Sequence, residues 1–433
     1  MGGMFETLKN AWRLPDLRKK LIFTIWMIVL FRVGGNIPVP GVDRTAFTNL
    51  ITQFGQLGSM LDIMSGGALA SASIFALGIS PYINSSIIMQ LLTVAIPALE
   101  RLAKEGETGR KKIQKITRFV TVGLSLLMSF AFWWSTRSTS TDVLPMAING
   151  LVVILSFTAG SCVVMWLGEM INEKGVGNGI SIIIFAGIVS SVPNMIRTTF
   201  ALARQWAVTN ILLAIVGIAV VFAIVLAGII VVLFVHQAER RIPVQYSKRV
   251  VGRKMYGGQS TYLPIKVNQS GVLPVIFATS IMQLPNLLVT FFFSTSTNPI
   301  AVWFRDIGRS PFYYLIMFVL IIAFTFFYSM IQFNPIEISN NIQKNGGFIP
   351  GIRPGRPTSD FIARTSQRLN WFDGLFLALI TLAPMLLGTL TGTSNTGIWF
   401  GGTSIIIMVG VCLDLTNQLE SQMSMRHYKG FLD

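Results

Sequence analysis

The chain has 433 residues, of which 52% are hydrophobic and only 12% are charged. Since a soluble domain carries about 25% charged residues, this composition argues against a water-soluble protein and predicts that lipid is its main solvent. Its 34 basic and 18 acidic residues give a formal net charge of +16. Two cysteines, Cys162 and Cys412, lie far apart in apolar runs, so neither a disulfide framework nor a metal site is expected.

The first twenty residues, 1–20, form an amphipathic segment. Phe5, Leu8 and Trp12 recur at helical spacing among polar residues. The segment lacks the apolar core of a secretory signal peptide. We therefore expect a cytoplasmic helix that lies at the membrane interface and leads into the first span.

Ten further segments are long and apolar enough to cross a bilayer, which takes about 20 residues. The second is the weakest, because "GGALASASIFALGISPYINSS" (Gly66–Ser86) is small and polar and contains Pro81. The predicted spans are residues 21–37, 74–97, 116–136, 146–170, 180–200, 208–235, 271–293, 312–333, 372–391 and 398–418.

The basic residues predict how these spans are oriented. With the N-terminus in the cytoplasm, 27 of the 34 lysines and arginines fall on the cytoplasmic side and 6 on the other. By the positive-inside rule, both termini are cytoplasmic. Ten spans divide into five and five, and a second half built like the first would be inserted upside down. We therefore predict an all-α polytopic membrane protein with two inverted halves, residues 21–205 and 206–418, and a tail at 419–433.

The sequence lacks several kinds of chemistry. It contains no G-x-x-x-x-G-K-[ST] phosphate loop. Its two histidines, His236 and His427, lie at cytoplasmic helix ends, which argues against a membrane-embedded hydrolase or lipid transferase. An ion-coupled secondary transporter with a five-plus-five repeat is the alternative function, but such a carrier would normally place a carboxylate in mid-span.

Few ionisable residues fall within the predicted spans. Arg32 lies in the outward half of the first span, where we expect it to snorkel or to pair structurally. Asp414 lies near the cytoplasmic end of the last span. Glu169, Glu337 and Asp373 fall at predicted helix ends, where snorkelling or hydration suffices. The sequence implies no cofactor.

Two long cytoplasmic loops, 236–270 and 334–371, mix arginine with glycine, proline and aromatic residues. Within them "YSKRVV" and "STYLPIKV" alternate as strands do, and "PGIRPGRP" favours ordered turns. Two interpretations stay open: a basic face for anionic lipid headgroups, or a docking platform for a large acidic or RNA-bearing partner.

Six motifs extend over essentially the whole chain. They are "FRVGGNIPVPGVD" (31–43), "SGGALASASIFALGISPYINSSIIMQLL" (65–92), "KEGETGRKKI" (104–113), "WLGEMINEKGVGNGISIIIFAGIV" (166–189), "FNPIEISNNIQKNGGFIPGIRPGRPT" (333–358) and "FGGTSIIIMVGV" (400–411). Together they resemble the SecY family of protein-conducting channels, which includes Sec61-alpha. The resemblance implies the pore-forming subunit of the secretory translocon in the bacterial plasma membrane. Such a channel would pass unfolded preproteins and release transmembrane segments sideways into lipid, and it would not be an enzyme.

The resemblance implies that the second predicted span is split. Its first part, about residues 57–70, would fold back as a re-entrant plug, and its second part, from about Ile74, would line a lateral gate. Small residues suit an element that must pack against a pore and also leave it. The plug residues would be Leu57, Met60, Leu61, Ile63, Met64, Ser65, Gly66, Gly67 and Ala68.

The resemblance also implies a pore ring and a gate. An apolar ring would exclude water and ions by dewetting and still let a polypeptide slide. Carried over motif by motif, it falls on Ile79, Ile83, Ile184, Ile188, Ile276 and Ile407. At the gate, polar residues of the second span would face the seventh and eighth spans, and which pairs touch stays open. These are Asn84, Ser85 and Gln90 on one side and Thr279, Ser280 and Gln283 on the other.

Partners follow from the resemblance as well. The motor ATPase SecA, or a ribosome, would dock on the two cytoplasmic loops, where Arg353 matches an arginine important in the family. Small membrane subunits SecE and SecG, the insertase YidC, signal sequences and anionic lipids would also bind. The docking residues would be Arg353, Arg356, Arg240, Arg241, Lys248, Arg249, Arg253 and Lys254.

Overall fold

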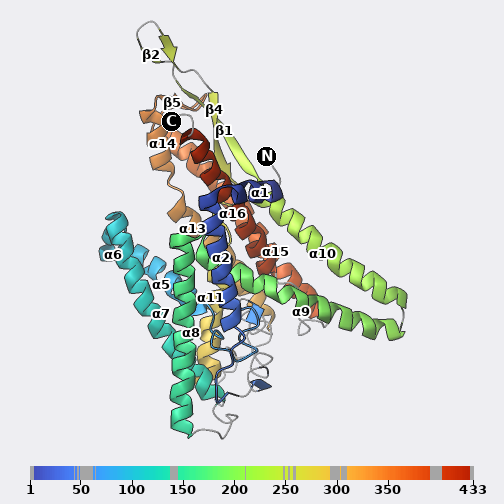
Figure 1. Ribbon diagram of the computed structural model, residues 1–433. Helices are drawn as coiled ribbons and strands as arrows, with labels where there is room; N and C mark the ends of the chain where they lie inside the picture. The colour runs from blue at the N-terminus through green and yellow to red at the C-terminus, as the bar shows by residue number, and fades with distance from the viewer. Residues whose placement is uncertain are drawn as a thin grey trace.

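The computed structural model of the protein is a bundle of long helices with a small β-structure at one end (Figure 1). It describes residues 4–42, 44–45, 48, 62–63, 65–136, 145–209, 211–246, 249–251, 254–256, 260–292, 303, 310–390 and 402–429.

Ten long helices each contain most of one predicted span. Seven of them have a stretch that is long and apolar enough to cross a membrane, and α5 with α6 (Pro97–Lys104), bent by 101°, forms an eighth candidate. The other two, α2 and α11, fall short because Arg18, Lys19 and Lys20 occupy the first turns of α2 and because the described apolar part of α11 is short. The ten helices are α2 (Pro15–Gly34), α5 (Ser80–Ala95), α7 (Glu107–Thr136), α8 (Met146–Lys174), α9 (Gly179–Thr209), α10 (Ile211–Gln237), α11 (Leu273–Phe292), α13 (Pro311–Gln332), α15 (Arg356–Leu390) and α16 (Gly402–Lys429).

The N-terminal segment forms its own helix, as its amphipathic pattern predicts. This helix, α1 (Met4–Arg13), packs on α16, where the Thr7 hydroxyl donates to Glu420 Oε1 at 3.1 Å. Buried Ala11, Leu17 and Leu419 join α1, α2 and α16 in a small apolar cluster. Both ends of the chain therefore lie at the end of the bundle that carries the strands (Figure 1).

The second span starts later than predicted. Helix α5 begins at Ser80 rather than at residue 74, and Pro81 occupies its first turn, where a missing N–H costs nothing. Residues 65–79, the turn segment, form successive turns instead. Gly66, Gly67 and Gly78 have positive φ there, as does Ala72 at 46°, which an interior helical residue cannot adopt.

The turn segment is held against neighbouring helices at very close range. A Cβ atom at Gly160 of α8 would lie 1.9 Å from the carbonyl oxygen of Ile74. Because a backbone atom cannot rotate away, Gly160→Ala should lower the free energy of unfolding by about 1–3 kcal/mol. Gly123→Ala in α7 is the matched control, since nothing lies within 4 Å of its added Cβ atom. Thermal unfolding in detergent measures both, and equal melting temperatures would contradict this packing.

Strands and short helices form a separate layer at one end, which we call the sheet module: β1, β4, β5, α14 and the first turns of α15. Strand β1 (Glu239–Tyr246) pairs antiparallel with β4 (Ser260–Lys266) and with β5 (Gly347–Phe348), and α14 (Pro335–Lys344) packs beside them. Five buried isoleucines and one valine from both predicted loops form its core: Ile242, Val244, Ile265, Ile342, Ile349 and Ile362.

The two segments predicted as cytoplasmic loops, 236–270 and 334–371, therefore contain regular strands and helices. The segment "STYLPIKV" does form a strand, β4, whereas "YSKRVV" spans the end of β1 and the start of β2 (Arg249–Val251), which pairs with β3 (Lys254–Tyr256). Helix α15 begins at Arg356, well before the predicted start of its span at residue 372. A hydropathy window misses these turns because they are polar and lie outside the apolar stretch.

Candidate channel and its gates

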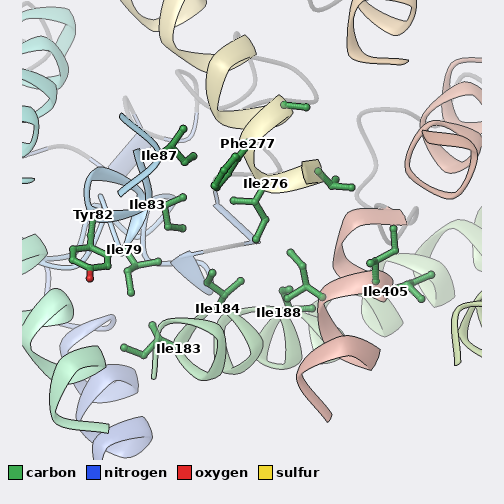
Figure 2. Close-up of a cluster of buried hydrophobic side chains, with 14 of the residues drawn as sticks. Ile79, Tyr82, Ile83, Ile87, Ile183, Ile184, Ile188, Ile276, Phe277 and Ile405 are labelled. Carbon is green, nitrogen blue, oxygen red and sulfur yellow. The ribbon is translucent and has the colours of Figure 1, made fainter. Parts of the chain in front are cut away.

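The six isoleucines assigned to a pore ring lie in one buried apolar cluster. They come from four elements far apart in sequence, and none has more than 8% of its surface exposed. Figure 2 shows Ile83, Ile184 and Ile276 pointing toward one another from α5, α9 and α11. The six are Ile79 and Ile83, Ile184 and Ile188, Ile276, and Ile407 of α16.

Helical spacing explains this convergence. Ile79, the N-cap residue of α5, lies four residues before Ile83, and Ile184 lies four residues before Ile188 in α9, so each pair lies on one side of its helix. Their side chains present no polar atom to the centre of the cluster. A constriction of this kind repels water and ions yet offers a polypeptide no strong binding partner.

Part of the predicted plug lies beside this cluster. Ile63, Ser65, Gly66, Gly67 and Ala68 are described, and Leu57, Met60, Leu61 and Met64 fall outside the described residues. The fold of this piece comes from local caps. Asp62 Oδ1 accepts the Ala70 N–H at 2.8 Å, and Ser65 Oγ accepts the Leu69 N–H at 3.2 Å.

Arg32 contacts this same piece directly. Its Nη1 donates to the Gly66 carbonyl oxygen at 2.9 Å, and Ser190 of α9 lies at the same oxygen, 3.5 Å away. A Cβ atom at Gly66 would lie 2.4 Å from Arg32 Nη1, so only glycine fits. The predicted structural role of Arg32 therefore takes a specific form, a bond between α2 and the end of the plug segment.

The polar residues assigned to the lateral gate do not all face one way. Ser85 faces α7, where its hydroxyl lies 2.6 Å from Thr121 Oγ1 and donates to the Thr117 carbonyl at 3.1 Å. This corrects its expected orientation toward α11. Asn84 and Ser280 are buried, and Thr279 donates to the Ile276 carbonyl of its own helix. Gln283 lies further along α11.

One polar contact does cross from α5 to the opposite side. The phenol oxygen of Tyr328 on α13 interacts with two side-chain amides, Gln332 on its own helix and Gln90 on α5. Tyr328 also packs edge-on against Phe277 of α11 at 5.4 Å between ring centroids. Tyr328 was not predicted as a gate residue, because it lies in the phenylalanine-rich run "FTFFYSM", where Thr325 and Ser329 also carry hydroxyls and nothing sets its own apart.

We expect the Gln90–Tyr328 bond to help keep the gate closed. A hydrogen bond between membrane helices contributes about 0.6–2 kcal/mol, so Tyr328→Phe should raise acceptance of defective signal sequences about fivefold. Tyr313→Phe on the same helix is the matched control, because the buried Tyr313 hydroxyl has no hydrogen-bond partner among the described residues. Export of a precursor with a weakened signal reports both variants, and equal export would remove Tyr328 from the gate.

Two carboxylates expected at hydrated helix ends are instead buried. Glu169 of α8 accepts from Arg118 Nε at 2.8 Å and from Gln114 Nε2 at 3.2 Å, which ties α8 to α7. Asp373 has no exposed surface, because α15 begins so early that this residue falls well inside the helix. Hydration therefore does not explain either residue.

The docking arginines lie on the sheet module. Arg353 and Arg356 are exposed, and hydrogen bonds hold the backbone of the loop that carries them. The Thr358 hydroxyl donates to the Arg353 carbonyl at 2.8 Å, and the Ser339 hydroxyl donates to the Gly355 carbonyl at 2.9 Å. A fixed backbone under an exposed guanidinium suits recognition of a carboxylate or phosphate surface.

The other docking residues lie on the strands. Arg240 and Arg241 are exposed on β1, and Arg241 Nε lies 2.7 Å from Glu239 Oε1. Arg249 and Lys254 belong to β2 and β3, and Lys248 and Arg253 fall outside the described residues. The two predicted docking loops therefore meet in one layer at one end of the bundle (Figure 1).

Apolar helices of membrane-spanning length, packed around a buried isoleucine cluster and beside a partly non-helical segment, define a multi-pass membrane protein. The SecY family profile matches residues 73–416 of the chain. The chain belongs to the SecY family, whose members form protein-translocation channels.

Relatives and solved structures agree with this assignment. Protein translocase subunit SecY of Streptomyces griseus is 44% identical over 447 aligned residues, which cover 99% of this chain and 100% of that protein. The SecY subunit of Thermotoga maritima is 41% identical, covering 99% and 98%.

The fold resembles those of solved channels. One is a SecY channel studied for how its plug domain stabilises the closed state, with a TM-score of 0.64 at 17% identity, covering 96% of this chain and 97% of that one. Another is Sec61 in the canine ribosome–channel complex, with a TM-score of 0.58 at 18% identity and the same coverage.

Proposed function

We propose that the isoleucine constriction is the pore ring of a passive channel that unfolded preproteins cross, and that the α5–α11/α13 seam is its lateral gate. The observation that carries this proposal is the convergence of six isoleucines from both halves of the chain on one buried cluster. Apolar transmembrane segments would leave sideways through the seam, because its polar contacts are few and individually weak.

The plug and the closed state belong to the same proposal. The turn segment and residues 62–63 lie beside the constriction and are bonded to α2 through Arg32. Non-helical backbone at membrane depth is tolerated where protein or water covers it, as it is here. Translocation would displace this segment, and its small residues would limit the cost.

Location and partners follow from the charge and from the relatives. We infer that the protein lies in the bacterial plasma membrane with both termini and the sheet module in the cytoplasm, where the basic residues concentrate. SecA or a ribosome would dock on the sheet module and supply the driving force. SecE, SecG and YidC are proposed as membrane partners, and anionic lipids as neighbours of the basic surface.

Protease protection of a secretory precursor tests the function. Vesicles would contain this chain with SecE, SecG, SecA and ATP, and the expected result is a precursor protected from external protease only when ATP is present. No protection with either SecA or ribosomes, in vesicles whose channel is folded and correctly oriented, would overturn the proposal. A saturable small-solute flux driven by an ion gradient would then favour the secondary-transporter alternative.

A further inference from the structure

A short connector joins the sheet module to the proposed gate helix. Strand β4 ends at Lys266, and α11, which carries Ile276 of the proposed ring, begins at Leu273. Residues 267–272, which we call the connector, are the direct covalent link between β4 and α11. The contacts that hold this connector therefore determine whether docking on the sheet module can move the gate helix α11.

Three consecutive connector residues bind three different helices. Asn268 Nδ2 lies 3.1 Å from His236 Nε2 of α10. Gln269 Oε1 accepts from Ser329 of α13 and from Ser366 of α15, each at 3.0 Å. The Ser270 hydroxyl donates to Asp373 Oδ2 of α15 at 2.8 Å. These hydrogen bonds fix the connector to α10, α13 and α15, and we call this bonded group the joint.

Asp373 is the unusual member of this joint. It is 0% exposed, and the ion pairs found among the described residues do not include it. Its Oδ2 accepts from the hydroxyl of Ser270, which lies three residues before the start of α11 at Leu273. This bond fixes the connector at the entry to the gate helix.

One face of α15 links this joint to the docking surface. Ile362, Ser366, Asn370 and Asp373 are buried and recur at helical spacing, so they form a continuous stripe. Ile362 lies in the core of the sheet module, and Ser366 and Asp373 bind the connector. Arg356 begins the same helix, about 26 Å from Asp373 at 1.5 Å per residue.

The joint also holds polar atoms without hydrogen-bond partners in the described protein. They are Gln269 Nε2, Asn370 Oδ1 and Asp373 Oδ1, one donor and two acceptors, all buried. An unpaired buried polar atom is costly, so an arrangement that pairs them is favoured.

We propose that this stripe of α15, with Asp373 as its positioning residue, couples a partner docked at Arg353 and Arg356 to the gate helix α11. The inference rests on the proposed function. Asp373 acts by holding Ser270, and it touches neither the translocating chain nor the docked partner.

The test separates docking from gate movement. Spin labels at Thr93→Cys on α5 and Ile281→Cys on α11, with Cys162 and Cys412 replaced by serine, report the distance between the two gate helices. The channel is reconstituted with SecE and SecG in nanodiscs, and SecA with a non-hydrolysable ATP analogue is added. SecA affinity is measured on the same samples.

With Asp373→Ala, which removes the oxygens that can accept from Ser270, we expect the SecA-free distance and the SecA affinity to match the parent, while the SecA-induced change in distance is lost. Ser270→Ala removes the same bond from the other side, and the double variant should be no worse than either single one. Asp414→Ala, which truncates an exposed side chain of α16, is the matched control and should keep the response. Asp373→Asn keeps an oxygen that can accept from Ser270 and should restore part of it.

Two results would overturn the inference alone. A full SecA-induced change in both Asp373→Ala and Ser270→Ala would show that the joint does not couple docking to the gate. A double variant that loses clearly more of the response than either single one would show that the residues do not act through one bond. A parent chain that neither binds SecA nor responds to it would instead overturn the proposed function, and the inference with it. Should Asp373→Ala fail to fold, Ser270→Ala decides the question.

Discussion

Arg353→Glu is expected to lower SecA-driven translocation by about thirtyfold or more, because losing a charged contact at an interface costs about 2 kcal/mol or more. Arg353 is exposed, and its backbone is fixed by Thr358 and by the core isoleucine Ile349. The side chain therefore meets a partner without first ordering its loop. Reversing its charge replaces attraction to an acidic surface with repulsion.

Lys9→Glu is the matched control for this variant. It makes the same charge change on α1, which lies at the same end of the bundle but outside both predicted docking loops (Figure 1). Protected precursor per minute and SecA affinity are the measurements. Normal translocation by Arg353→Glu, with the expected amount of folded protein, would remove Arg353 from the docking site.

Hydropathy predicts the centres of the membrane spans but not their ends. The centres of the spans follow from apolar length alone, as α8 and α13 show. Their ends do not, because α7 and α15 continue as polar helix beyond the membrane-length stretch. The late start of α5 follows from Pro81 and from the glycines before it, a local signal that a hydropathy window averages away.

The directions of side chains were harder to predict than their helices. A helix that is apolar all round carries no periodic signal to say which face meets which neighbour. Ser85 was therefore expected to face α11 but binds α7, and the partner of Gln90 proved to be Tyr328. The isoleucine constriction came from resemblance to a family, since nothing in an isoleucine separates a pore from a core.

Asp373 shows a second limit of the same kind. Read against a span beginning at residue 372, it is a helix-end carboxylate that water can reach. Once α15 is seen to begin at Arg356, the same residue falls inside the helix and against Ser270. A shifted boundary thus changed the chemistry expected of a side chain, and only tertiary contacts revealed its role.

Ile83→Asn is expected to open the closed channel to ions and to relax its demand for a functional signal sequence. Ile83 is 7% exposed, and it points toward Ile184 and Ile276 in the constriction (Figure 2). An amide there gives water hydrogen bonds at the point where an apolar ring excludes it by dewetting. Burying the amide lowers the free energy of unfolding by about 1–3 kcal/mol. We therefore expect the variant to stay folded while its pore becomes wetted.

The control must separate a wetted pore from a polar residue in a membrane helix. Ile230→Asn makes the same substitution on α10, where the side chain is 64% exposed on the outer surface of the bundle. Single-channel conductance in planar bilayers, without SecA or precursor, should rise for Ile83→Asn and stay at the parent level for Ile230→Asn. Equal, low conductance in both would take Ile83 out of the ring. Equal, raised conductance in both variants would show that any asparagine in this bundle causes an ion leak. The isoleucines are the seal only if Ile83→Asn raises the conductance and Ile230→Asn does not.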